Sequence, residues 1–104
     1  MFARFVSIHL KSNMLSDYTR TFENDTLPLL RQQKGFKDEI TLSNPGSLDV
    51  IAISLWESKA NAETYNTNTY PQVLRTLERM IDGAPKVQTF EAVTSTFHKL
   101  AVAA

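Results

Sequence analysis

The chain has 104 residues, of which 42% are apolar and 21% are charged. This length and composition predict one globular domain over residues 1–104, since single domains commonly run to about 100 to 150 residues. Eleven basic residues balance eleven acidic ones without a basic run, so nucleic acid and anionic membranes are not expected as partners. The absence of cysteine excludes disulfides and thiolate chemistry, and it is compatible with a cytoplasmic location.

The first predicted element is a strand over residues 3–11, where side chains alternate with a period of two. One face would carry Val6, Ile8 and Leu10, and the other Phe5, Ser7 and His9. Both faces are bulky, so both are expected to be covered. Arg4, His9 and Lys11 interrupt the apolar character, so this segment is predicted to be neither a secretory signal nor a membrane span.

Residues 15–32 predict a helix, because apolar residues recur at helical spacing. The stripe consists of Leu15, Tyr18, Phe22 and either Leu29 or Leu30. Asn13 or Ser16 is the expected N-cap. Pro28 lacks the amide that would donate to Asn24, so the helix should kink or restart there, and Lys34-Gly35 should end it.

A hairpin is predicted next, because turn residues 44–47 separate two strand-like segments. In residues 36–43, Phe36, Asp38, Ile40 and Leu42 alternate with Lys37, Glu39 and Thr41. The second strand covers residues 49–56.

The second predicted helix starts with Ser58 as its cap, pauses at Tyr70-Pro71 and runs to a stop at Asp82-Gly83. Residues 86–97 are rich in β-branched and aromatic residues and predict a fourth strand. His98 is expected to be exposed, and the tail from Leu100 to Ala104 to be frayed.

The resulting order is β-α-β-β-α-β, which predicts an α+β, ferredoxin-like antiparallel sheet with both helices on one face. The opposite face would carry Phe5, Ile51, Ile53 and Leu55, which are too apolar to leave in water. Two sheets pressed together would hide them, so a homodimer is expected.

Three short motifs resemble the antibiotic biosynthesis monooxygenase family, part of the dimeric α+β barrel superfamily. They are the Lys34-Gly35-Phe36 turn, the strand end Leu55-Trp56-Glu57-Ser58, and the following helix with Tyr65 and Tyr70-Pro71. The resemblance implies a homodimeric barrel with a small pocket in each subunit between sheet and helices. It also implies oxygenation of an electron-rich phenol, anthrone or quinol by molecular oxygen without a cofactor.

The same superfamily includes haem-degrading enzymes, and this chain departs from their pattern. Their first-strand Asn, their second Trp and their axial His correspond here to Val6 or Ile8, to Tyr65 and to Arg75. A guanidinium cannot ligate iron, so haem degradation is disfavoured.

Three residues are candidates for catalysis. His9 would accept a proton, because its reference pKa lies near neutrality. Tyr65 would donate to a substrate oxygen and Arg75 would stabilise developing negative charge. Each has a structural alternative: His9 would line the dimer barrel, Tyr65 would bridge core and solvent, and Arg75 would pair with Glu78.

The candidate substrate-binding residues are Trp56, Tyr70, Phe22 and Ile8. Trp56 would stack on a planar substrate or serve as a packing anchor, and Tyr70 would donate a hydrogen bond. Phe22 and Ile8 would supply apolar walls.

No metal-binding pattern is present, since His9 and His98 are far apart without clustered carboxylates, and no glycine-rich phosphate loop occurs. Two other functions stay open: a non-catalytic ligand-binding or stress-associated dimer, and an isomerase or lyase of the same superfamily. A cavity shared by His9, Tyr65 and Arg75 would favour catalysis, and their separation would favour binding.

Overall fold

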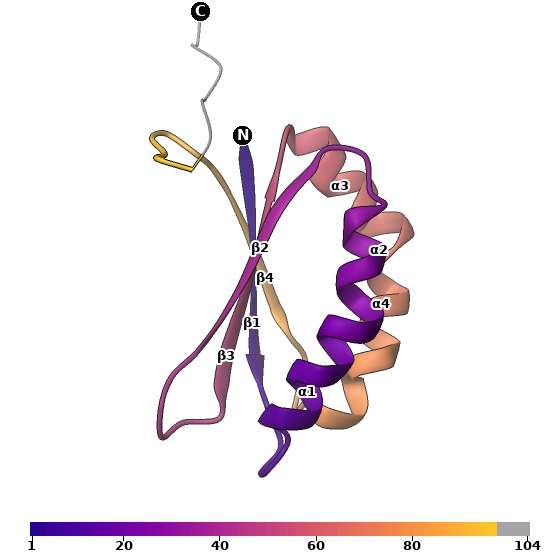
Figure 1. The fold of residues 1–104 in the computed structure, drawn as a ribbon, viewed down its shortest axis with the longest axis vertical. Coiled ribbons are helices and arrows are strands. Elements are labelled where there is room, and N and C mark those ends of the chain that lie inside the picture. Colours follow the sequence, from indigo (N-terminus) through magenta and orange to yellow (C-terminus); the bar gives the residue numbers. More distant parts are fainter. Residues whose placement is uncertain (98–104) are drawn as a thin grey trace, which may run out of the picture.

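The computed structural model of the chain describes residues 1–97. Four strands form one antiparallel sheet, namely β1 (Phe2–His9), β2 (Phe36–Ser43), β3 (Asp49–Trp56) and β4 (Lys86–Glu91). The strand order is β2-β3-β1-β4, so β1 and β3 are central and β2 and β4 are edges (Figure 1). The predicted hairpin is confirmed at both of its strands. The predictions for His98 and the tail Leu100 to Ala104 lie outside the described residues.

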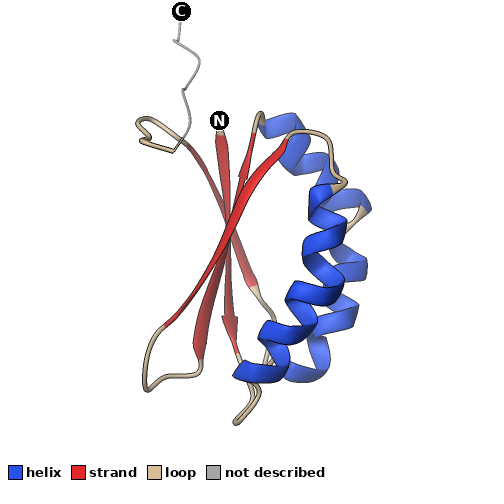
Figure 2. Ribbon diagram, in the orientation of Figure 1, coloured by secondary structure: helices blue, strands red, loops and turns tan. Residues whose placement is uncertain are grey.

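Two helical runs cover one face of this sheet (Figure 2). The first consists of α1 (Leu15–Thr21), a π-helical turn (Phe22–Thr26) and α2 (Leu27–Arg31). The second consists of α3 (Lys59–Asn68), α4 (Tyr70–Leu77) and a 3-10 turn (Glu78–Met80). The predicted ferredoxin-like α+β fold is therefore confirmed.

Local signals set most helix boundaries. Ser58 caps α3, its Oγ accepting from the backbone N–H of Asn61 at 3.2 Å. The expected restart at Pro28 is confirmed, because α2 begins at Leu27 directly after the π-helical turn. The expected cap at Asn13 or Ser16 is wrong: Met14 is the N-cap residue and makes no side-chain cap bond.

Two predicted elements end earlier than expected, each because of its pairing with β1 or with the residue that follows β1. The second helical run stops at Met80, not at Asp82, because Ile81 is extended, forms a bridge with Leu10 and is 6% exposed. Strand β4 ends at Glu91, not at residue 97. Glu91 pairs with Phe2, so β1 offers hardly any strand beyond that point.

A β-bulge in β2 changes which side chains face the helices. Phe36 pairs with Trp56 while Asp38 pairs with the next residue, Leu55, so one extra residue lies between them. Phe36 and Glu39 therefore share the helical side, and Asp38 and Ile40 share the other. The uninterrupted alternation expected for this strand is wrong at Phe36.

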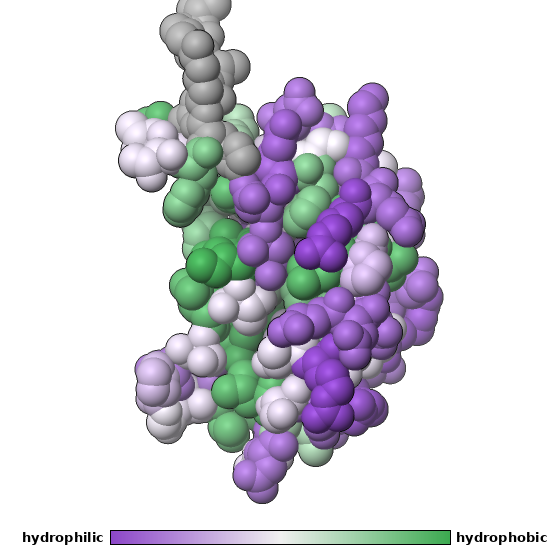
Figure 3. Space-filling view, in the orientation of Figure 1, coloured by the Kyte–Doolittle hydropathy of each residue, from purple (hydrophilic) through white to green (hydrophobic). Residues whose placement is uncertain are grey.

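The sheet has one face against the helices and one open face, which is the face turned away from them. The core fills the helical side and includes Val6, Ile8, Tyr18, Trp56 and Met80. The open face carries apolar residues on all four strands, among them Phe5, Ile40, Leu42, Ile51, Ile53, Leu55 and Phe90. Figure 3 shows hydrophobic residues along this side and mostly hydrophilic ones over the helices.

Among residues 1–97, no helix combines the length and the apolar character that a membrane span requires.

Candidate functional site

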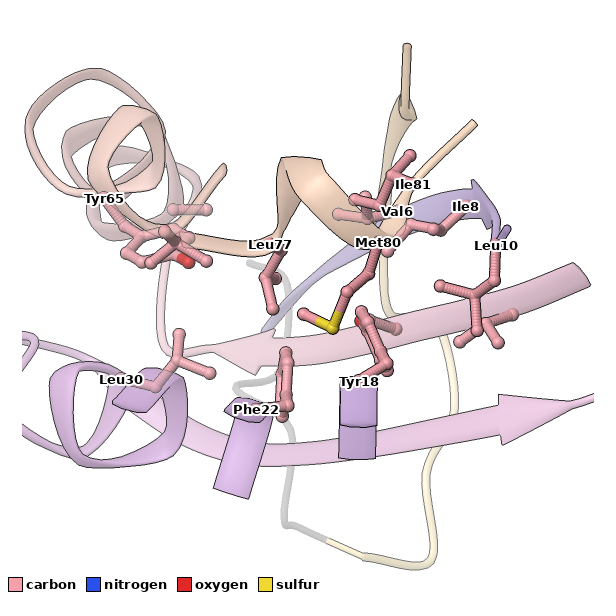
Figure 4. Close-up of a cluster of buried hydrophobic side chains, with 14 of the residues drawn as sticks. Val6, Ile8, Leu10, Tyr18, Phe22, Leu30, Tyr65, Leu77, Met80 and Ile81 are labelled. Carbon is pink, nitrogen blue, oxygen red and sulfur yellow. The ribbon is translucent and has the colours of Figure 1, made fainter. Parts of the chain in front are cut away.

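An inner cavity lies between the sheet and the helices. Its volume is about 30 Å³, which is room for one or two waters. Most of its wall is apolar, with a few polar groups; the lining residues are Arg4, Val6, Ile8, Tyr18, Phe22, Leu30, Glu39, Ala52, Ile53, Ser54, Tyr65, Tyr70, Leu74, Leu77, Ile81 and Pro85. Figure 4 shows several of them converging from sheet and helices.

An outer groove of about 660 Å³ lies between the first helical run and β2. Tyr18, Phe22 and Glu39 line both the groove and the inner cavity. These three side chains therefore form the wall between the two spaces. The β2 side of the groove carries the short side chains of Thr41 and Ser43, which leave it open.

Three phenols line the inner cavity. Burial raises the pKa of Tyr65 to about 12 and raises that of Tyr70 as well, although Arg4 opposes both shifts. Burial also raises the pKa of Tyr18, whose hydroxyl is buried without a hydrogen-bond partner. All three therefore stay protonated at neutral pH and are able to donate hydrogen bonds.

Arg4 places a cation in the same wall although it is only 3% exposed. Its guanidinium carbon lies 4.1 Å from the ring centre of Tyr70 and 5.2 Å from that of Tyr65. One terminal nitrogen donates to Asn66 Oδ1 at 2.8 Å, while Nε is buried without a partner. Burial lowers the pKa of Arg4, and the two tyrosines oppose that shift.

Glu39 is the acidic residue in the cavity lining, and the bulge in β2 puts it there. Its Oε2 accepts a hydrogen bond from Thr41 Oγ1 at 2.6 Å. Burial raises the pKa of Glu39 more than this hydrogen bond lowers it. A carboxylate with a raised pKa at the entrance of an apolar cavity is a stronger base than one in water.

Four of the residues singled out in the sequence meet in this cavity: Tyr65, Tyr70, Phe22 and Ile8. Trp56 does not line it. Its ring is fully buried, packs against Tyr65 with ring centres 5.0 Å apart, and donates from Nε1 to Ser54 Oγ at 2.9 Å. This geometry matches the expected packing anchor and supports the cavity wall from behind.

The structure does not bring His9 or Arg75 to the cavity. His9 belongs to the open face of β1, and its half-exposed ring lies 2.9 Å from Asp49 Oδ1 through Nδ1. Arg75 is exposed on α4, whereas its neighbour Leu74 lines the cavity. His9, Tyr65 and Arg75 therefore do not share one cavity, which is the outcome expected to favour a ligand-binding protein. Among residues 1–97, Arg75 forms no ion pair with Glu78 within 4 Å.

Sequence reasoning missed Arg4, Tyr18 and Glu39 as site residues. A signal existed for Arg4, because the alternation that assigns Val6 and Ile8 to one face assigns Arg4 to it too. Tyr18 belonged to the predicted helical stripe. Glu39 had no such signal, since the bulge that reorients β2 leaves no pattern in the sequence.

Within the described residues, no group of three or more His, Asp or Glu side chains is arranged to hold a metal ion.

Comparison of sequences found no matching family model and no matching curated protein. Solved structures do match. A proposed antibiotic biosynthesis monooxygenase from Nitrosomonas europaea has a TM-score of 0.74 at 11% identity, over 90% of this chain and all of that one. A protein of unknown function from the same organism has a TM-score of 0.77 at 14% identity, over 94% of each chain.

SnoaB from Streptomyces nogalater, described as a cofactor-independent oxygenase, has a TM-score of 0.74 at 13% identity, over 93% of this chain and 98% of that one. Identities this low establish a shared fold and do not transfer an activity. The chain thus has the fold of the antibiotic biosynthesis monooxygenases, as the turn, strand-end and helix motifs predicted.

Proposed function

We propose that this protein is a cofactor-independent oxygenase that acts on a small electron-rich aromatic compound such as a phenol, anthrone or quinol. The observation that carries the proposal is the inner cavity, where apolar walls meet protonated phenols and a buried cation. Such a cavity supplies desolvation, orientation and electrostatic stabilisation, which is what a substrate that itself reduces oxygen needs from a protein. SnoaB, which has the same fold, is described as an oxygenase of this cofactor-independent class.

In this proposal the substrate enters from the outer groove, because the inner cavity alone is too small for an aromatic ring. Tyr18 and Phe22 move aside, and the ring then lies against Phe22 and Ile8. Tyr65 and Tyr70 donate hydrogen bonds to the substrate oxygen. Their raised pKa values keep the protons in place for this role.

Glu39 takes the role of base that the sequence suggested for His9. It accepts the substrate proton, and the resulting carbanion-like species transfers electrons to molecular oxygen. One oxygen atom forms a bond to substrate carbon and the other leaves as water. For an anthrone methylene oxidised to a carbonyl, the substrate provides all four electrons that dioxygen takes up, so no separate reductant is needed.

Oxygen uptake by metal-free protein tests this function, using a panel of anthrones, hydroquinones and flavonols. Uptake should fall at least about tenfold in Glu39→Gln and in Tyr65→Phe, as is usual when a base or a hydrogen-bond donor is lost. Arg79→Ala is the matched surface control and should keep wild-type rates, since Arg79 is exposed. Loss of uptake in His9→Ala or Arg75→Ala would contradict the assignment of base and charge stabiliser to the cavity residues and support the roles predicted from the sequence.

A ligand-binding protein without turnover is the second candidate, and the separation of His9 and Arg75 from the cavity favours it. It predicts that the same aromatic compounds raise the melting temperature while no compound is oxidised. An isomerase or lyase would instead convert its substrate without consuming oxygen.

We also propose a homodimer formed through the open face, as the sequence predicted. Ile40, Leu42 and Phe90 on this face are 55%, 48% and 50% exposed, and they span the sheet from edge to edge. A second copy of the same face would bury them by pairing sheet with sheet. Leu42→Glu should convert the dimer to a monomer in sedimentation experiments, while Thr41→Glu on the helical side should not. A wild-type monomer would refute the proposal. Cytoplasmic location stays a prediction.

A further inference from the structure

The guanidinium of Arg4 is a buried cation with no anionic partner in residues 1–97. No acidic side chain lies within 4 Å of it. It donates a hydrogen bond to the neutral amide of Asn66, and its Nε is buried without any acceptor. A buried charge and a buried unpaired donor are both costly, so both are usually matched by a counterion or a ligand.

The two tyrosines beside Arg4 stabilise its charge but do not provide an acceptor for Nε. Tyr70 and Tyr65 offer their faces to the guanidinium at 4.1 Å and 5.2 Å, which is cation–π geometry. The ring faces stabilise the charge, and the Tyr70 side chain is also a hydrogen-bond partner of the guanidinium, but Nε still has no acceptor. The remaining requirement is an acceptor oxygen, and a negatively charged one would also neutralise the cation.

Arg4 belongs to the walls of two spaces. Arg4 and Tyr70 line both the inner cavity and a second groove of about 370 Å³ between α3 and β4. In the second groove, Lys59 and Glu63 lie 3.7 Å apart and largely offset each other's charge. In the inner cavity, Glu39 becomes neutral when it accepts the substrate proton, and the burial that raises its pKa favours this proton transfer.

We infer that Arg4, together with Asn66 and Tyr70, forms an oxyanion-binding site for an ionised phenol. The aromatic ring occupies the inner cavity, and the phenolate oxygen accepts from the free Nε of Arg4. This inference rests on the proposed function only in placing an aromatic compound in the cavity. The site holds that compound as the phenolate rather than as the phenol.

Titration of 4-nitrophenol under argon tests the site without any turnover, because the phenolate absorbs visible light and the phenol does not. Binding should lower the apparent pKa of the ligand by about one unit, because a nearby opposite charge favours the ionised form. This shift corresponds to about a tenfold preference for the anion. The neutral analogue 4-nitroanisole should bind at least about tenfold more weakly at a pH where the phenol is ionised.

Asn66→Asp is the sharpest variant. It places a carboxylate where the amide oxygen now lies 2.8 Å from the guanidinium, and Asn66 is exposed, so folding should be retained. The built-in counterion should abolish the preference for the phenolate. Asn68→Asp, the same change two residues on at another exposed position of α3, should leave it intact. Arg4→Met should also abolish it, with circular dichroism as the check on folding.

The inference is overturned if bound 4-nitrophenol keeps or raises its pKa, if Asn66→Asp retains the wild-type shift, or if no complex forms. If binding lowers the pKa of 4-nitrophenol as expected but the protein oxidises none of the aromatic compounds, the inferred anion site stands and the proposed oxygenase activity is rejected.

Discussion

Replacement of Gly35 by alanine tests how the turn before β2 is joined to the start of α3. Gly35 has a φ of 79°, a conformation that costs an L-residue about 1–2 kcal/mol. The added Cβ would also collide with the side-chain amide of Asn61 and lie 2.8 Å from its Cβ. Asn61 would have to move and lose the hydrogen bond that its Oδ1 accepts from Ser58 Oγ at 2.7 Å, which contributes about 1 kcal/mol. The expected loss in the free energy of unfolding is therefore about 2–3 kcal/mol.

Gly46 provides the matched control. Its φ is 80°, and a Cβ built there would meet nothing within 4 Å. Gly46→Ala should therefore cost only the backbone component, about 1–2 kcal/mol. Urea unfolding followed by the fluorescence of Trp56, the only tryptophan in the chain, measures both variants. The difference of about 1 kcal/mol corresponds to about 4–8 °C in melting temperature for a domain of this size. Equal losses in the two variants would refute the reasoning, since they would mean that Asn61 moves away without cost.

Two further predictions concern the buried tyrosines. Tyr18→Phe removes a buried hydroxyl that has no partner, so stability should stay unchanged or rise by up to about 1 kcal/mol; a loss above that in thermal unfolding would reveal a partner for the hydroxyl. Alkaline pH should destabilise the protein through Tyr65, whose pKa is about 12 when folded against an ordinary value of 10.0. Between pH 10 and 12 the unfolded chain has released this proton and the folded chain still holds it, so stability falls with rising pH by about 1.4 kcal/mol per unit for this group. Urea unfolding at several alkaline pH values should show a shallower decline in Tyr65→Phe, and an equal decline would contradict the assignment.

Local patterns in the sequence predicted the elements whose boundaries depend on nearby residues. The hairpin strands, the Ser58 cap and the restarts at Pro28 and Pro71 are confirmed, because turn geometry, capping and the missing proline amide act within a few residues. The β-α-β-β-α-β order then restricts the chain to the ferredoxin-like topology. The same local rules were wrong for the N-cap at Met14, where no side chain caps the helix.

The site depended on how the elements pack. Tyr65, Tyr70, Phe22 and Ile8 line the cavity because apolar and aromatic side chains on the inner faces of sheet and helices have to converge; their role in binding a substrate stays a prediction. Arg75 was expected on the cavity side of α4, but it is exposed and its neighbour Leu74 lines the cavity. Consecutive side chains on a helix point about 100° apart, so an error of one residue in the helix phase accounts for the difference.

The sequence by itself determined the order of the elements, the pairing of β2 with β3 and the apolar side of each helix, because these follow from interactions between residues close in the chain. Tertiary structure alone decided that Glu39 turns towards the cavity through the bulge in β2, that Ile81 leaves the helix to bridge Leu10, and that Arg4 meets Asn66, 62 positions away. Those arrangements depend on register and close packing between distant segments, whose free energies no local pattern of residues encodes.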